Sequence, residues 1–387
     1  MKDLVFIGGG HSHAIALRLW ALNPLPGVRI TLISEASDTP YSGMLPGHVA
    51  GFYQRQECYI DLDLLTQFAQ TQFYVDRVIG LDLEKNHVIC QNHLPIKFDL
   101  LSIDIGSTPY IPQIKDSDLC PYSIAAKPIK NLLESWDNLL TNIRTNPPKS
   151  LKISIVGGGV SGVELSIAIQ HRLKQELKVY NTNLIVNLIH QESELLSNHN
   201  RWVRQRVHQV LKSRQIYLHL SETAVGIIPN LTTNKANCIL QCESGLKIPS
   251  DYIFWVTQAH APHWLQSTGL TLDNRGFILV KDTLQSVSHP HIFAAGDIAT
   301  MINHPRPKAG VFAVRQGQPL FHNLQNVILG KTLKNYCPQT KYLNLIGTAD
   351  GKAIASRGNW GWHSFLLWKL KDYIDQKFMR KFRKLHN

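Results

Sequence analysis

The sequence predicts an α/β protein that contains two nucleotide-binding units of the same design. Two segments of the 387-residue chain run from an apolar strand through a glycine-rich turn into a helix, and Gly157 opens the second turn about 149 positions after Gly8 opens the first. With 44% hydrophobic residues, a chain of this length can bury two separate cores. Strand, turn, helix and a second strand in this order begin the unit known as the Rossmann fold.

The first unit starts at the N-terminus. After the apolar run Leu4–Ile7, Gly8 and Gly10 fill the first two positions of a GxGxxG turn that leads into a helix. Backbone N–H groups at such a helix start can bind a diphosphate, and side chains there would block its approach. His13 stands where the third glycine is usual, which we expect to weaken the packing of helix on strand while leaving the phosphate cradle intact.

The strand that follows this helix, Val28–Ser34, ends in an acid, Glu35, 25 residues past Gly10. A carboxylate at this place can accept hydrogen bonds from ribose hydroxyls. A glycine motif alone also fits a plain tight turn. Strand, turn, helix, strand and acid in this order favour a dinucleotide site instead.

The second unit repeats the pattern with a complete motif. An apolar strand ends at Val156, and Gly157, Gly159 and Gly162 form a full GxGxxG at the start of a helix. The next strand ends in His190 rather than in an acid, so the sequence leaves the choice between NADH and NADPH open. Two such units indicate two bound dinucleotides, and the alternative is one working site and one relic.

Charge and length limit the partners. The net charge is +12, and residues 361–387 hold seven Lys and Arg against two Asp, so nearly half of the excess lies in the last 27 residues. A nucleic-acid groove needs charge spread along a face, so we expect no nucleic acid as a partner. No apolar run approaches the roughly 18 residues of a spanning helix, and the first strand starts too near Met1 for a secretion signal. We expect a cytoplasmic chain that touches the inner face of a membrane peripherally.

The C-terminal segment, residues 336–387, carries a different pattern. From Trp360 to Leu385, apolar and aromatic residues recur at steps of three and four, with Lys and Arg between them. This spacing predicts an amphipathic helix that lies in the headgroup layer of an anionic membrane. The alternative is a helix that packs on the body of its own chain or on a second copy in a homodimer.

Three further segments, taken with the glycine turns, resemble those of the flavoproteins that bind two dinucleotides, which include type II NADH:quinone reductases, sulfide:quinone reductases and disulfide reductases. LSIDIGSTP, which contains Gly106 and Ser107, resembles the segment that lines the domain crossing. IFAAGDIA, which contains Gly296 and Asp297, resembles the motif whose aspartate bonds the flavin ribityl chain. KAGVFAVRQGQ, residues 308–318, resembles the helix start beside the flavin ring.

This resemblance covers about residues 1–345 and implies FAD in the first unit and NAD(P)H in the second, in a glutathione-reductase-like arrangement without a redox disulfide. The FAD domain is expected to comprise residues 1–125 and 264–335, and the NAD(P) domain residues 126–263. The residues expected to bind the cofactors are Gly8, Gly10, His11, Glu35, Gly106, Ser107, Gly157, Gly159, Gly162, Gly296 and Asp297.

A closer resemblance is to the NADH-dehydrogenase-like domain that some bacteria fuse to selenide, water dikinase. The stretches GGGHSHAIAL, TPYSGMLPGHVAGFY and KDTLQSVSHPHIFAAGDIATM carry it. No kinase domain follows residue 387, so we expect a stand-alone relative or a fragment.

Cysteine positions narrow the electron acceptor. Disulfide reductases carry a CxxxxC pair in the segment that here reads PYSGMLPGHVAG, so a thiol–disulfide relay is excluded. Sulfide:quinone reductases also use cysteines near the flavin, and Cys120 and Cys337 match no such motif. His289 and His291 could form a metal pair, but Pro290 between them favours a turn, and we expect no metal.

The resemblance also implies catalytic residues. Glu164, two residues past Gly162, resembles a glutamate near the nicotinamide, and the alternative is an acid that only stabilises the helix start. Gln316 and Lys308 are expected to contact the electron acceptor, whereas Gln316 could instead cap the preceding turn.

Three histidines, His11, His13 and His48, could carry protons or simply line loops. Together these features predict an FAD-dependent NAD(P)H:quinone oxidoreductase. The alternatives are a reductase of selenium or sulfur metabolism and a flavin-binding redox sensor without turnover.

Overall fold

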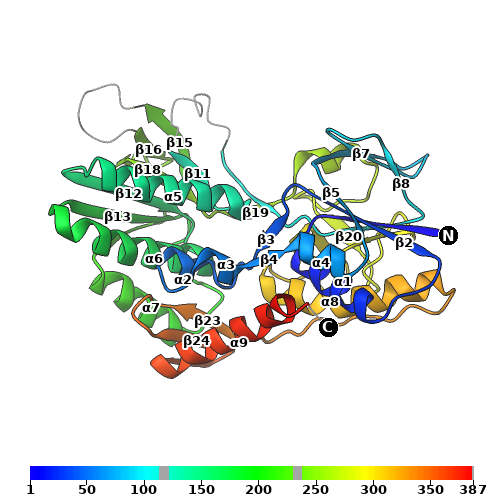
Figure 1. The fold of residues 1–387 in the computed structure, drawn as a ribbon. Helices are drawn as coiled ribbons and strands as arrows, with labels where there is room; N and C mark the ends of the chain where they lie inside the picture. Colours follow the sequence, from blue (N-terminus) through cyan, green and yellow to red (C-terminus); the bar gives the residue numbers. More distant parts are fainter. Residues whose placement is uncertain (113–121, 230–237, 386–387) are drawn as a thin grey trace.

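The computed structural model describes residues 1–112, 122–229 and 238–385, and it contains two five-stranded parallel sheets (Figure 1). The first sheet has the order β21-β9-β1-β2-β5, and the second has the order β11-β18-β12-β13-β14. Each glycine turn follows the central strand of its sheet, where the chain connections on the two sides diverge. Ligands of open α/β sheets bind at this point.

The strands of both sheets are largely buried, as expected for parallel strands covered on both faces. The first sheet consists of β1 Lys2–Ile7, β2 Val28–Ser34, β5 Gln72–Val75, β9 Leu100–Ile103 and β21 Ile292–Ala294. The second consists of β11 Ser123–Ala125, β12 Ser150–Val156, β13 Asn183–His190, β14 Ile216–Leu220 and β18 Tyr252–Trp255. The predicted fold class is therefore confirmed.

Helices cover the sheets. Helix α1 lies against α8, where Trp20 and Phe321 meet edge to face with 5.7 Å between ring centroids. In the second unit, α6 packs on β13. The helices are α1 His11–Leu22, α2 Leu45–Val49, α3 Arg55–Cys58, α4 Leu62–Phe68, α5 Ile129–Thr145, α6 Val160–Leu177, α7 Arg201–Ser213, α8 Gly310–Ile328 and α9 Phe365–Arg383. None of these helices in the described residues is long and apolar enough to cross a membrane.

Smaller antiparallel sheets and pairs complete both units. Three-stranded sheets are formed by β6 Val78–Asp82, β7 His87–Cys90 and β8 Ile96–Lys97, and by β15 Ala224–Pro229, β16 Cys238–Cys242 and β17 Lys247–Ser250. Paired strands are β3 Asp38–Pro40 with β4 Tyr59–Asp61, β10 Thr108–Pro109 with β19 Ala259–His260, and β20 Ile278–Val280 with β22 Ala299–Met301. The second sheet includes β11, three residues that the expected division at 125/126 assigns to the first domain.

The C-terminal segment differs from the expectation of one helix from Trp360 onward. Trp360–Ser364 forms β25, which pairs with β24, Ala353–Arg357, and β24 pairs with β23, Asn344–Gly347. Helix α9 starts only at Phe365, where the Ser364 side chain accepts a hydrogen bond from the backbone of Leu367. The helical spacing of the tail residues was therefore misleading for its first five positions, which a sheet partner far away in sequence converts to a strand.

Helix α9 also packs on its own chain. Phe378, Met379 and Phe382 belong to the core of the first unit, and Leu367 packs against β24. The apolar tail residues thus divide between two faces of α9, one buried and one exposed.

Candidate active site

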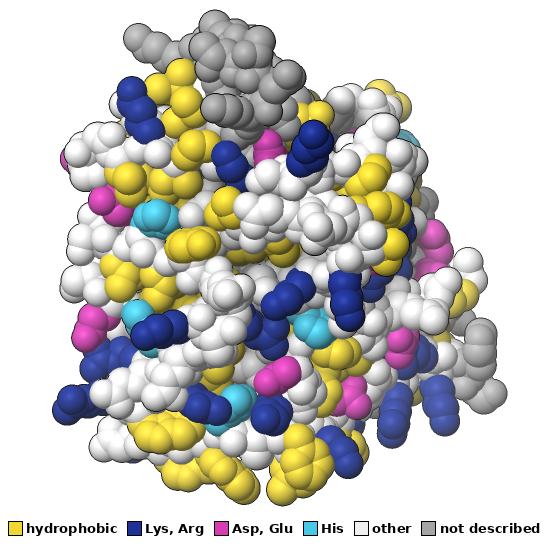
Figure 2. All heavy atoms as spheres, turned by 90° about the vertical axis from the view of Figure 1, so that its left-hand side faces the viewer, with side chains coloured by type: hydrophobic (Ala, Val, Ile, Leu, Met, Phe, Trp, Pro, Cys, Tyr) yellow, Lys and Arg dark blue, Asp and Glu magenta, His cyan; other side chains and the backbone are white. Residues whose placement is uncertain are grey.

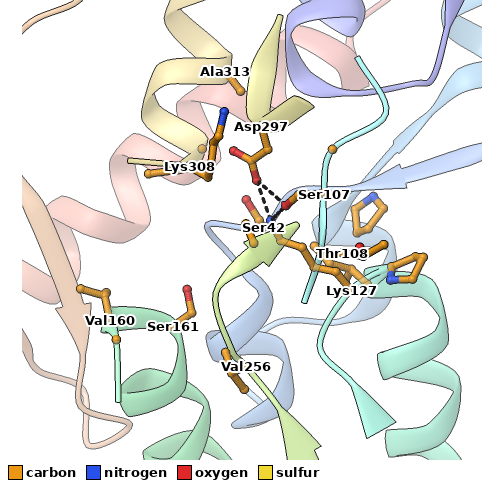
Figure 3. A pocket seen from close by; sticks show the side chains of 18 of the residues that line it. Ser42, Ser107, Thr108, Lys127, Val160, Ser161, Val256, Asp297, Lys308 and Ala313 are labelled. Carbon is orange, nitrogen blue, oxygen red and sulfur yellow. Dashed lines mark hydrogen bonds and ion pairs between the residues drawn. The ribbon is translucent and has the colours of Figure 1, made fainter. Parts of the chain in front are cut away.

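A single cavity of about 2140 Å³ is lined by both glycine turns. Gly8 and Gly10 reach it from the first unit, and Gly157 and Gly159 reach it from the second. Figure 3 shows Asp297 and Lys308 of the first unit on one side of the pocket, and Val160 and Ser161, which open α6, on the other. Two ligands held by the two turns would therefore share one space.

The first turn is shaped so that only glycine fits it. Gly8 has φ +91°, and a Cβ there would lie 2.3 Å from the backbone oxygen of Asp104. A Cβ on Gly10 would lie 2.2 Å from the carboxyl carbon of Asp104. The backbone at the start of α1 is thus left open to a ligand.

His13 does not loosen the contact of helix and strand. Its Nδ1 lies 2.7 Å from the backbone oxygen of Gly8, and its Nε2 lies 2.8 Å from Oγ of Ser102 on β9. Burial lowers the pKa of His13 to about 3, so the ring is neutral and can donate through one nitrogen and accept through the other. The imidazole replaces the third glycine as a hydrogen-bonded bridge between turn and sheet.

His11 offers a buried acceptor beside the first turn. Its Nε2 has no hydrogen-bond partner among the described residues, and burial lowers the pKa of the ring to about 4. The ring meets Tyr41 and Phe378 edge to face at 5.3 and 6.0 Å between centroids. A neutral nitrogen without a partner in a cavity wall fits contact with a hydroxyl or N–H of a bound ligand.

Asp297 follows β21 and lies in an ion pair that the sequence did not indicate. Lys127 Nζ lies 2.6 Å from Asp297 Oδ2 and 3.0 Å from Ser107 Oγ (Figure 3). Burial alone would raise the pKa of Asp297, but the Lys127 ammonium holds it below the usual value. Lys127 precedes α5 in no recognisable motif, so only the fold brings it to the site.

The other predicted contacts of the first unit lie along the same cavity. Glu35 lines it with a side chain that is 65% exposed, 3.5 Å from Nε of Arg77. Gly106 also lines it and has φ +71°, and Gly296 likewise has φ +71°. A Cβ on Gly296 would lie 2.3 Å from Oδ1 of Asp104.

The second turn is as tight as the first. Gly157 has φ +123°, and a Cβ there would lie 2.3 Å from the backbone oxygen of Val256. A Cβ on Gly162 would lie 1.8 Å from the backbone oxygen of Gly157, so a glycine is needed for α6 to start here. Gly159 precedes α6 and has open space around it.

Acidic side chains surround the end of β13. His190 Nδ1 accepts a hydrogen bond from the backbone of Gly158 at 3.2 Å, and its Nε2 lies 3.9 Å from Oε2 of Glu192. Glu222 lines the cavity at the same end. Among the described residues, no Lys or Arg from β12 to β18 lines the cavity.

Gln316 and Lys308 are held by the protein itself. Gln316 Oε1 accepts a hydrogen bond from the backbone of Gly296 at 2.7 Å. Lys308 Nζ donates to the backbone oxygen of Ala299 at 2.6 Å and lies 4.0 Å from the ring centroid of Phe277. Burial lowers the pKa of Lys308 to about 8. Both side chains brace the segment around Asp297, and contact with an acceptor stays a prediction for each.

Glu164 lies in a buried polar cluster. Its Oε1 accepts a hydrogen bond from the backbone of Gly347 at 2.7 Å, and burial raises its pKa to about 7. Lys371 of α9 opposes that rise through its charge, while Nζ of Lys371 lies 2.8 Å from Oδ2 of Asp375 and 2.6 Å from the backbone oxygen of Gly43. All three ionisable side chains line the cavity.

The remaining histidines are engaged in local contacts. His48 Nδ1 lies 2.9 Å from the backbone oxygen of Tyr53, and His291 Nε2 lies 3.0 Å from Oδ1 of Asn86. His289 Nδ1 contacts the hydroxyl of Ser288 at 2.9 Å. Within residues 1–112, 122–229 and 238–385, no three His, Cys, Asp or Glu side chains are grouped to hold a metal ion.

Comparison with known proteins identifies the family. Residues 2–317 match the family described as pyridine nucleotide-disulphide oxidoreductase. The chain belongs to this family. It is therefore an oxidoreductase, and FAD and NAD(P)H are the cofactors typical of the family.

Relatives within and near the family span most of the chain. Ferroptosis suppressor protein 1 of Xenopus tropicalis is 26% identical over 290 residues, which cover 73% of this chain and 71% of the relative. NADH dehydrogenase-like protein YutJ of Bacillus subtilis is 25% identical over 364 residues, 91% of each chain. The type II NADH:quinone oxidoreductase of Haemophilus influenzae is 28% identical over 192 residues, 44% of this chain and 41% of the relative.

Solved structures of the same fold include the sulfide:quinone oxidoreductase of Aquifex aeolicus. It superposes with a TM-score of 0.78 at 19% identity and covers 100% of this chain and 92% of its own. The water-forming NADH oxidase of Lactobacillus brevis, bound to NADH, gives a TM-score of 0.72 at 19% identity and covers 92% and 75%.

The residues of this family member fit the two typical cofactors. Both turns exclude any side chain larger than hydrogen, and the unpartnered Nε2 of His11 faces the wall of the shared cavity. Lys371 and Asp375 are contacts that the sequence analysis missed. The signal was present, because Leu367, Lys371, Asp375 and Phe378 share one helical stripe, so the two charges fall on the buried face.

Proposed function

We propose that this protein is an NAD(P)H:quinone oxidoreductase that uses FAD in the first unit. The observation that carries the proposal is the single cavity shared by both glycine turns, with the Glu164, Lys371 and Asp375 cluster in its wall. Among the described residues that line this cavity there is no cysteine, which supports an acceptor other than a disulfide.

The names of two relatives support a quinone as that acceptor. The relative from Haemophilus influenzae is a type II NADH:quinone oxidoreductase. A Synechocystis relative, 24% identical over 205 residues, is a demethylphylloquinone reductase. Both matches cover about half of this chain or less of its relatives, so the acceptor is assigned here by proposal.

The protein's own residues would position the reactants and move a proton. FAD, when bound, accepts hydride and passes electrons onward. Reduction of a quinone to its hydroquinone needs two electrons and two protons, and a hydride brings both electrons with only one proton. A second proton must come from solvent, and Glu164, whose pKa is about 7, can give and take one near neutral pH. Lys371 favours the ionised form of Glu164 and so sets that balance.

The absorption spectrum of the purified protein, followed by steady-state kinetics, tests the proposal. We expect a flavin spectrum that NADH or NADPH bleaches, and colour that returns when a soluble quinone is added. Turnover only with selenium or sulfur compounds would favour a reductase of that metabolism. A flavin that neither nucleotide bleaches would favour a redox sensor and refute the proposal.

We also propose that α9 binds an anionic membrane through its exposed face. Phe365, Leu366, Leu370, Tyr373 and Ile374 are 40–55% exposed, next to exposed Lys369 and Lys377. Figure 2 shows hydrophobic side chains gathered along the lower edge of the face, below which Figure 1 places β24 and the start of α9. Aromatic side chains flanked by cations suit the headgroup layer.

Point variants test the membrane proposal better than truncation, because truncation would also remove the buried face of α9. We expect Leu366→Ser with Leu370→Ser to reduce co-sedimentation with phosphatidylserine-containing vesicles. Leu94→Ser, at a residue that is 86% exposed in the first unit, is the matched control. Equal sedimentation of both variants and the wild type would contradict membrane binding by α9.

A further inference from the structure

Asp104 is a buried acid directly behind the first glycine turn. It follows β9 and is 2% exposed. Its Oδ2 accepts hydrogen bonds from the backbone of Ser12 at 2.9 Å and of His13 at 3.3 Å. Its backbone oxygen accepts from the backbone of Gly10 at 3.1 Å. The acid therefore occupies the start of α1, where a dinucleotide diphosphate would bind.

The second carboxyl oxygen of Asp104 points between two glycines of the cradle. Oδ1 would lie 2.3 Å from a Cβ on Gly10 and 2.3 Å from a Cβ on Gly296. These glycines belong to the turn after β1 and the turn after β21, and Asp104 itself lines the cavity. Oδ1 is thus placed to meet a ligand that lies across both turns.

The charge on Asp104 decides whether that meeting is favourable. An ionised carboxylate repels the negative charges of a diphosphate at short range, and the repulsion is strong in a buried site. A protonated carboxyl can donate one hydrogen bond to a phosphate oxygen while its other oxygen still accepts from the helix start.

The surroundings favour the protonated form near neutral pH. Burial raises the pKa of Asp104 to about 7, the backbone groups of His13 and Ser12 oppose the rise, and the charge of Asp297 adds to it. His11 and His13 on α1 have pKa values lowered to about 4 and about 3, so they are neutral. Asp297 is held ionised by Lys127.

We propose that Asp104 binds the diphosphate of FAD as a protonated acid, so that loading of the cofactor takes up a proton. The inference rests on the proposed placement of FAD in the first unit. It predicts a cofactor affinity that is level in mild acid and falls as the pH rises through neutrality, because the proton must then be taken from solvent.

FAD titrations of the apoprotein, followed by flavin fluorescence between about pH 6 and about pH 9, test this directly. For the wild type we expect the Kd to rise about tenfold for each pH unit above the pKa of Asp104. Asp104→Asn has the same shape and keeps an N–H donor, so its Kd should change by less than about threefold over the same range. Glu164→Gln removes the other cavity acid with a pKa of about 7 and should keep the wild-type slope.

Calorimetry of wild-type protein provides a second measurement that needs no variant. FAD binding at about pH 8, measured in two buffers of different ionisation enthalpy, should show uptake of about one proton. Tight FAD binding without proton uptake and with a level Kd would overturn the role of Asp104 and leave the proposed function standing. Absence of FAD binding at every pH would overturn both.

Discussion

Substitution of Lys371 by Met tests whether the buried pair of α9 stabilises the fold. In the wild type, Nζ of Lys371 lies 2.8 Å from Oδ2 of Asp375, and these side chains are only 10% and 6% exposed. Removal of one partner from such a pair leaves an uncompensated buried charge, which costs about 3–5 kcal/mol. A protein of this length loses about 2 °C of melting temperature per kcal/mol, so we expect a drop of about 6–10 °C.

Thermal unfolding followed by circular dichroism measures this drop, and two variants calibrate it. Lys369→Met changes an exposed lysine of the same helix and should shift stability by less than about 0.5 kcal/mol. Lys371→Met with Asp375→Leu replaces the whole pair by apolar groups and should recover most of the loss. A single variant that melts within about 2 °C of wild type, or a double variant no more stable than the single, would refute the reasoning.

Two further predictions concern charge in the cavity. Because burial raises the pKa of Glu164 from 4.5 to about 7, its contribution to stability is full below about pH 4.5 and is lost as the pH rises to about 7, by up to about 3 kcal/mol. Glu164→Gln should therefore flatten the plot of melting temperature against pH across that window, and an unchanged slope would contradict the assignment. Glu192 and Glu222 at the end of β13 should repel a 2′-phosphate, so we expect kcat/KM for NADH to exceed that for NADPH by about tenfold or more. Glu192→Gln should narrow the ratio, and equal constants in the wild type would argue against it.

Local patterns were sufficient to predict the two units. The strand Val28–Ser34 has the bounds that were predicted, and both glycine turns occur between strand and helix. These segments are predictable because buried parallel strands need continuous apolar runs and the turns admit only glycine. Fold class and family followed from features contained within about 35 residues each.

Contacts between distant segments could not be predicted in this way. Lys127 meets Asp297 across 170 positions, and Gly347 meets Glu164 across 183. Trp360–Ser364 forms a strand because β24 offers it a partner, although its own spacing fits a helix. The roles of Gln316 and Lys308 likewise depend on which neighbours the fold supplies.

The first sheet also sets a limit on the order of biogenesis. Strand β21 and the turn at Gly296 and Asp297 complete a cradle that begins at Gly8, and the whole second sheet is encoded between them. At a synthesis rate of about 5–20 residues per second, roughly 15–60 s pass between the first and last of these residues. The inserted unit can finish folding while the N-terminal strands still wait for their last neighbour. Capture of the flavin is therefore a late event in the life of the nascent chain.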